Sequence, residues 1–301
     1  MVYYREFVVK TFRQYIREQK ELLTLLEKQI IIGKGKKYGQ IVFMAGGAGS
    51  GKGFAVNNFM EGDKFKVRDV DQWKKAFLIL AQTKKKYKQI RGLDLNKPKD
   101  AFKLHKFIQK KGIKEKTLSL LLLNARQGIL PNILIDTTLQ HKGKIQEALP
   151  SLLEAGYDPK NIHIVWVLTD YSVAIKQNRD PERGRVVPDD IMLQTHEGAA
   201  TTMFQFIKRG TPRGVNGGVY IVLGGKNNTV FYTDKDGKPL KTGKKKDTMV
   251  VKDFSYITMK EPGRAMTSNK DLQNKAFDWI MKNAPRTLTN KNMFGSEQET
   301  S

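Results

Sequence analysis

The chain has 301 residues, with 54 Lys and Arg against 30 Asp and Glu, and therefore a formal net charge of +24. It contains no cysteine, which excludes disulfides, thiolate catalysis and cysteine-ligated metal centres, and its four histidines are too scattered to indicate a transition-metal site. No apolar run approaches the roughly 20 residues of a membrane-spanning helix, and the charged first turns are unlike a secretory signal. We expect a cytoplasmic protein of one or two domains.

Hydrophobic periodicity predicts the elements in chain order. Residues 5–31 form one long amphipathic pattern, whose apolar stripe is expected to pack on the core or on a protein partner. Short apolar runs predict strands at 40–45, 65–70, 132–136, 162–168 and 219–223. Helical patterns lie between them at 52–60, 72–82, 101–126, 141–155, 171–178 and 189–208. This alternation indicates an α/β fold, in which a parallel β-sheet is flanked by helices on both faces.

The pattern changes after about residue 210. Residues 229–233, a turn at 234–237 and residues 248–251 predict a β-hairpin or small meander, and residues 268–283 predict a final amphipathic helix. The predicted organisation is therefore an N-terminal helix at 1–38, a core at 39–212, a β-rich extension at 213–263, and a C-terminal helix and tail at 264–301.

The positive charge is concentrated in two segments. Residues 84–116 contain thirteen Lys and Arg but three acidic residues, and a second lysine cluster lies at 235–246. Each cluster is either a solvated surface or a track for the phosphates of a nucleic acid or another polyanion. Both segments are candidate polyanion-binding surfaces.

A glycine-rich loop follows the first predicted strand and opens a predicted helix. Its pattern, Gly-x4-Gly-Lys, in this context is that of a P-loop. The glycines let backbone N–H groups converge on a phosphate at the positive end of a helix dipole, and the lysine reaches the β- and γ-phosphates. We expect ATP or GTP to bind here, through Gly46, Gly47, Ala48, Gly49, Ser50, Gly51, Lys52 and Gly53.

One position of the loop departs from the pattern. The Ser or Thr that normally follows the lysine and contacts Mg²⁺ is Gly53 in this chain. Mg²⁺ would then be held by nucleotide phosphates, water and an acidic residue elsewhere. The alternative is a non-catalytic protein that binds nucleotide or nucleic acid on a diverged kinase fold.

Charged residues also follow the next three predicted strands, at the sheet edge that carries the loop. Phosphoryl transfer needs such a set: a carboxylate to accept the hydroxyl proton, an acidic group near the metal, and cations that stabilise the moving phosphoryl group. Simpler interpretations are a helix cap for Asp71, a turn residue for Asp136, and surface charge for the arginines. The residues are Arg68, Asp71 and Lys74, then Asp136, then Arg179, Arg183 and Arg185.

This combination resembles the P-loop kinases of the zeta-toxin and bacteriophage polynucleotide-kinase group, and is also similar to chloramphenicol phosphotransferases. The matching features are Asp71 two residues before Trp73, the pair Asp136-Thr137, and the arginine-rich turn that runs to Pro188. The turn differs in length from the polynucleotide-kinase pattern. The resemblance spans residues 39–208 and implies a kinase-type P-loop NTPase fold.

The resemblance also implies an activity: ATP-dependent transfer of a γ-phosphoryl group to a hydroxyl of a nucleic acid or nucleotide-type acceptor. Asp71 would be the general base, and Asp136 would organise Mg²⁺ through water. The lid arginines would close over the phosphates beside Lys52. The acceptor would be bound by residues around the base, namely Arg68, Lys74 and Asp136.

Overall fold

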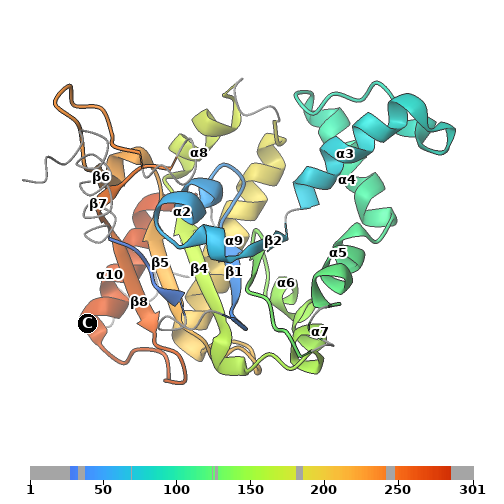
Figure 1. The fold of residues 1–301 in the computed structure, drawn as a ribbon. Coiled ribbons are helices and arrows are strands. Elements are labelled where there is room, and N and C mark those ends of the chain that lie inside the picture. Colours follow the sequence, from blue (N-terminus) through green and yellow to red (C-terminus); the bar gives the residue numbers. More distant parts are fainter. Residues whose placement is uncertain are drawn as a thin grey trace, which may run out of the picture.

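The computed structural model describes residues 28–32, 38–68, 70–123, 125, 128–180, 186–241 and 248–285, with side chains except at 70–72. A six-stranded sheet in the order β2-β3-β1-β4-β5-β8 lies at its centre (Figure 1). Every neighbouring pair is parallel except β5 with β8. The strands are β1 (Ile41–Ala45), β2 (Lys66–Arg68), β3 (Ile133–Asp136), β4 (Ile162–Leu168), β5 (Val219–Leu223) and β8 (Tyr256–Lys260). The predicted parallel α/β architecture is confirmed.

Helices connect these strands. They are α2 (Lys52–Asn58), α3 (Val70–Thr83), α4 (Pro98–Lys110), α5 (Ile113–Leu122), α6 (Gly143–Gln146), α7 (Leu149–Glu154), α8 (Tyr171–Asn178), α9 (Asp189–Arg209) and α10 (Lys270–Asn283). Short 3-10 turns lie at η2 (Gly62–Lys64), η3 (Lys85–Ile90), η5 (Pro159–Asn161) and η7 (Lys226–Asn228).

Alternate residues of β1 contribute to two separate cores, as the period of a strand requires. Val42 and Met44 pack with α2 and with a small antiparallel sheet of β6 (Thr229–Phe231) and β7 (Val251–Phe254). Phe43 packs with α7, α9 and α10 on the opposite face (Figure 1). Because both faces are covered, β1 and β4 are fully buried.

A helical lobe lies between β2 and β3 in sequence and beside the β2 edge of the sheet in space (Figure 1). Its helices, α3, α4 and α5, share a third core that includes Phe77, Leu104, Phe107 and Ile113. The single helix predicted at 101–126 is wrong: it is two helices, because Gly112 adopts φ +60° between them and interrupts the helical backbone.

Of the N-terminal helix predicted at 5–31, residues 5–27 lie outside the described residues. For residues 28–31 the prediction is wrong. Ile30 forms a parallel bridge with Met60 and Ile32 is buried, whereas Ile31 between them is exposed. This alternation is that of an extended segment, which β-branched residues favour. The helix predicted at 141–155 divides into α6 and α7, since Pro150 lies in the first turn of α7.

The region after residue 212 contributes to the main sheet. β5 pairs in parallel with β4, and β8, which was not predicted, pairs antiparallel with β5. The segment boundary predicted between residues 212 and 213 therefore separates β5 and β8 from the other strands of the same sheet. The predicted hairpin is present as β6 and β7, although β7 begins at Val251, and the lysines at 244–246 lie outside the described residues. Within the described ranges, no helix combines the length and apolar content needed to cross a bilayer.

His163 in β4 joins three segments at one end of the sheet, and its titration should be visible in the stability of the protein. Gly218 N–H donates to Nδ1 (2.8 Å), so Nε2 carries the proton and donates to Gln40 Oε1 (2.9 Å). Burial, assisted by the charge of Lys260, lowers the pKa of His163 to about 4.

His163 therefore stays neutral in the folded protein at pH values where the same residue in the unfolded chain, with its ordinary pKa near 6.5, binds a proton. The free energy of unfolding should fall as the pH is lowered from about 6.5 towards 4, by up to about 1.4 kcal/mol per pH unit. Urea denaturation across this range, with His163→Gln as the comparison, measures the slope. An unchanged slope in the variant would contradict this assignment.

Candidate active site

The predicted P-loop joins β1 to α2, and three of its glycines adopt conformations that other residues rarely reach. Gly46, Gly49 and Gly51 have φ of +147°, +75° and +82°. A Cβ on Gly49 would come within 2.6 Å of the Ala174 carbonyl oxygen in α8. Thr169, directly after β4, donates to the Ser50 carbonyl oxygen (2.7 Å). The loop is thus curled by its glycines and held in place by the chain that follows β4.

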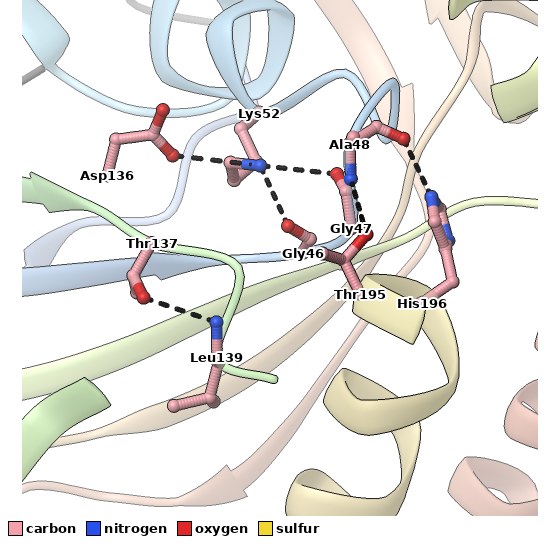
Figure 2. Close-up of polar contacts among 9 residues, drawn as sticks. All are labelled: Gly46, Gly47, Ala48, Lys52, Asp136, Thr137, Leu139, Thr195 and His196. Carbon is pink, nitrogen blue, oxygen red and sulfur yellow. Dashed lines mark hydrogen bonds and ion pairs between the residues drawn. The ribbon is translucent and has the colours of Figure 1, made fainter. Parts of the chain in front are cut away.

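Lys52 joins this loop to the end of β3. Its Nζ donates to the carbonyl oxygens of Gly46 (2.8 Å) and Gly47 (3.2 Å), and lies 3.6 Å from Asp136 Oδ1 (Figure 2). Asp136 ends β3, where it pairs in register with Met44 of β1. The lysine and the carboxylate therefore meet because their strands are neighbours, although 84 positions separate them in the sequence.

Two adjacent side chains of α9 hold the tip of the loop. Ala48 N–H donates to Thr195 Oγ1 (3.4 Å), and His196 Nε2 donates to the Ala48 carbonyl oxygen (2.7 Å) (Figure 2). Since a carbonyl only accepts, the His196 tautomer with hydrogen on Nε2 is assigned from this contact. Burial lowers the pKa of His196, the bond to Ala48 opposes this, and Lys52 lowers it further, so the ring is neutral near pH 7.

A cavity of about 560 Å³ lies beside Lys52 and Asp136. This volume is in the range of small-molecule sites. Its walls come from the P-loop, the end of β3, the helical lobe, and residues 186–188 with the start of α9. The lobe contributes apolar side chains such as Leu95, Phe102 and Ile108. Besides Lys52, the lysines on the wall are Lys74, Lys106, Lys114 and Lys144.

Some of this positive charge is already compensated. Glu147 forms an ion pair with Lys114, and its Oε1 lies 3.8 Å from Lys144 Nζ. Burial raises the pKa of Glu147, but the hydrogen bond and charge of Lys114, with Lys144, lower it more, so the carboxylate stays ionised.

The wall at 186–188 is fixed at the base of the predicted arginine lid. Asn178, fully buried at the end of α8, exchanges two hydrogen bonds with the backbone of Val187 (2.7 and 3.0 Å). Val186 N–H donates to the Leu95 carbonyl oxygen (3.1 Å), which attaches this wall to the helical lobe. The local sequence does not predict these contacts, since its one indication is the asparagine that precedes the arginines.

The structure brings together some of the predicted site residues but not all. Lys52, Asp136 and Lys74, which is 9% exposed, line the cavity. Arg179 is exposed and pairs with Asp189 (2.7 Å), outside the cavity lining. The backbone of Asp71 lies in the first turn of α3, one turn before Lys74, and its side chain is not described. Arg183 and Arg185 lie outside the described residues.

Arg68, predicted to bind the acceptor, is 6% exposed and does not line the cavity. Its guanidinium donates to the Lys114 carbonyl oxygen at the start of α5. Burial lowers the pKa of Arg68, and the charges of Glu115 and Glu147 oppose that shift. In this position Arg68 attaches β2 to the helical lobe.

The fit of the site to Mg²⁺ is partial. In the described part of the chain, no three His, Asp or Glu side chains converge as a ligand set. Gly53 supplies no hydroxyl, but among the described side chains the Asp136 carboxylate beside Lys52 could reach a metal on the nucleotide phosphates. Mg²⁺ commonly takes one or two carboxylates with phosphate and water ligands, so these residues fit a nucleotide-bound ion.

The sequence matches no family model and no curated protein. Similar solved structures include the AvrRxo1-ORF1:AvrRxo1-ORF2 complex, with 11% identity over 97% of this chain and 86% of that one, and a TM-score of 0.46. The same complex with ATP has 10% identity over 96% and 85%, and a TM-score of 0.41. A chain of the PezAT chromosomal toxin–antitoxin system of Streptococcus pneumoniae has 13% identity over 92% and 97%, and a TM-score of 0.41. Likeness at this level assigns no activity, substrate or partner to this chain.

Position 53 should accept a metal-binding side chain. It is exposed in α2, and a Cβ added there meets no atom within 4 Å. Gly53→Ser and Gly53→Ala should both fold, with alanine stabilising α2 by up to about 1 kcal/mol. Serine alone adds an oxygen ligand, so only Gly53→Ser should tighten ATP binding in Mg²⁺, by about fivefold. Calorimetric titration with and without Mg²⁺ measures this, and an equal gain in the alanine variant would contradict it.

Gly47 should be intolerant of the change that Gly53 accepts, because a Cβ on Gly47 would overlap the His196 ring. Gly47→Ala should weaken ATP binding by about tenfold or more. Adding His196→Ala removes the overlap, so the double variant should bind ATP better than the sum of the two single effects predicts. Strict additivity of the free energies would show that the ring does not restrain the loop.

Proposed function

We propose that this chain is an ATP-dependent phosphotransferase that moves a γ-phosphoryl group to a hydroxyl of a nucleotide-type or nucleic-acid acceptor. The observation that supports it best is the position of Lys52, between the P-loop carbonyls and Asp136, at the wall of a cavity of small-molecule size. GTP is the second candidate donor.

Nucleotide binding begins with Lys52. Its contacts with Gly46 and Gly47 are to carbonyl oxygens, and a triphosphate offers stronger, charge-assisted acceptors. On binding, the ammonium group transfers from those oxygens to the β- and γ-phosphates, and Asp136 remains within reach of the phosphates. Mg²⁺, when bound, would neutralise charge on the phosphates, with Asp136 holding it through water.

Transfer then requires an acceptor in the cavity. The acceptor oxygen attacks the γ-phosphorus, the bond from that phosphorus to the β–γ bridging oxygen breaks, and the nucleoside diphosphate leaves. Asp71, in the first turn of α3, accepts the hydroxyl proton, and Lys74 one turn later faces the same cavity. Arg179 exchanges its ion pair with Asp189 for the phosphates. Arg183 and Arg185, the other two arginines of the proposed lid, add their positive charge to the same phosphates.

The cavity favours a small acceptor, or one end of a strand, over the middle of a polymer, because a duplex does not enter about 560 Å³. Its wall combines apolar groups, including the Phe102 ring, with lysines. An acceptor with a planar apolar part and an anionic part fits both, and nucleotides have this composition.

The alternative is a non-catalytic nucleotide-binding protein, which the absent hydroxyl at Gly53 favours. The two differ in turnover. Radiolabelled ATP with Mg²⁺ is incubated with nucleotides, nucleotide-sugars and 5′-hydroxyl oligonucleotides, and the labelled product is resolved. ATP binding with neither hydrolysis nor transfer to any acceptor would support the alternative, whereas ATP hydrolysis without transfer to any acceptor would contradict both.

Two variants separate binding from chemistry. Lys52→Ala should lose ATP binding, whereas Asp71→Asn should retain ATP affinity but lose transfer by about a hundredfold or more, as expected for a general base. Asp63→Asn, which removes the same charge from an exposed residue of η2, is the matched control and should leave the rate unchanged. Full turnover by Asp71→Asn would exclude Asp71 as the base.

A further inference from the structure

The outer face of α4 is a row of lysines. Lys99, Lys103, Lys106 and Lys110 follow the spacing i, i+4, i+7 and i+11, which places them on one side of the helix. At 1.5 Å per residue the row is about 16 Å long. All four are exposed, whereas Leu104 and Ile108 on the opposite side, and Phe107 at the flank of the row, are buried in the core of the lobe. We call these four residues the lysine row.

The charge of the lysine row is barely compensated. The ion pair that α4 forms within its own length joins Lys103 to Asp100 at 4.0 Å. Lys99 and Lys110 form no ion pair with any described residue. η3 lies alongside, with Tyr87 against Phe107 (6.3 Å between ring centroids), and contributes the exposed Lys85, Lys86 and Lys88. A concentrated positive surface with so little internal compensation requires an anionic partner or many counterions.

We propose that the lysine row, with η3, binds the sugar–phosphate backbone of a nucleic acid without reading its sequence. Successive lysines of the row lie about 4.5 to 6 Å apart along the helix axis, so a backbone running beside α4 would contact several of them at once. Contact with phosphates alone releases counterions and gives affinity that falls steeply with salt.

Other anionic partners fit this surface less well. A helix that binds a membrane surface exposes an apolar face for insertion beside its charges, but the apolar face of α4 is occupied by the lobe core. The centres of protein interfaces are depleted in lysine and enriched in aromatic residues. On α4, the one large apolar side chain that is exposed is Phe102, which lies under Lys106 (5.4 Å).

The test compares two triple variants with the same change of charge. Lys99→Gln, Lys103→Gln and Lys110→Gln are combined in the row variant, which leaves Lys106 intact because it also lines the cavity. Lys270→Gln, Lys275→Gln and Lys282→Gln are combined in the control variant, which changes three exposed lysines of α10. Circular dichroism and ATP affinity should be unchanged in both.

Binding of short fluorescein-labelled single-stranded and duplex oligonucleotides is measured by anisotropy over a range of NaCl, without ATP. For the wild type, the logarithm of the association constant should fall linearly with the logarithm of the NaCl concentration. Each phosphate contacted should contribute about −0.7 to −0.9 to this slope. The row variant should reduce that slope by about 2 and weaken binding at low salt by about tenfold or more. The control variant should change the slope by less than about 1.

Three outcomes would overturn the proposal: no oligonucleotide binding by the wild type at low salt, equal weakening by both triple variants, or unchanged binding by the row variant. Binding to phosphatidylserine vesicles that depends on the lysine row, without oligonucleotide binding, would assign the row to a membrane surface instead. Since no nucleotide is used, Lys52→Ala should bind oligonucleotides normally. The proposal therefore stands or falls independently of phosphoryl transfer.

Discussion

The parallel pairing of β1 with β3 is the constraint on which the candidate site depends. The register Met44 to Asp136 places the carboxylate beside the P-loop lysine, with 3.6 Å between Lys52 Nζ and Asp136 Oδ1. A shift of this register by one residue would turn Asp136 to the other face of the sheet. The register is maintained by burial on both faces, since Phe43 and Val42 fill separate cores. The geometry of the candidate site thus depends on apolar packing in the two cores on either face of the sheet.

α9 adds a second constraint, because one helix serves two parts of the site. It begins directly after the cavity wall at 186–188, and two turns later Thr195 and His196 hold the Ala48 peptide group. α9 therefore connects the cavity wall at 186–188 directly to the tip of the P-loop. The neutral state of His196 suits this role, since a protonated ring beside Lys52 would repel it.

Much of the fold could be predicted because buried strands have simple patterns. The apolar runs at 162–168 and 219–223 match β4 and β5 residue for residue. The failures have two causes. The helices predicted at 101–126 and 141–155 are divided at Gly112 and Pro150, which the apolar periodicity alone does not register. Elsewhere tertiary contacts override local periodicity, and the end of the pattern at 5–31 becomes an extended segment because Met60 lies beside Ile30. β8 was missed because its pairing with β5 decides its conformation.

The sequence by itself determined the P-loop, because its backbone geometry requires glycines at fixed positions and the lysine follows them directly. It also determined that carboxylates and arginines follow the strands at one sheet edge. Only the tertiary structure decided which of these residues meet. Asp136 and Lys74 line the cavity, whereas Arg68 is buried against α5. The P-loop is held by Thr195 and His196 of α9, which lie about 150 residues further along the chain. The reason is physical: a contact between distant segments depends on strand order and register, which no local pattern encodes.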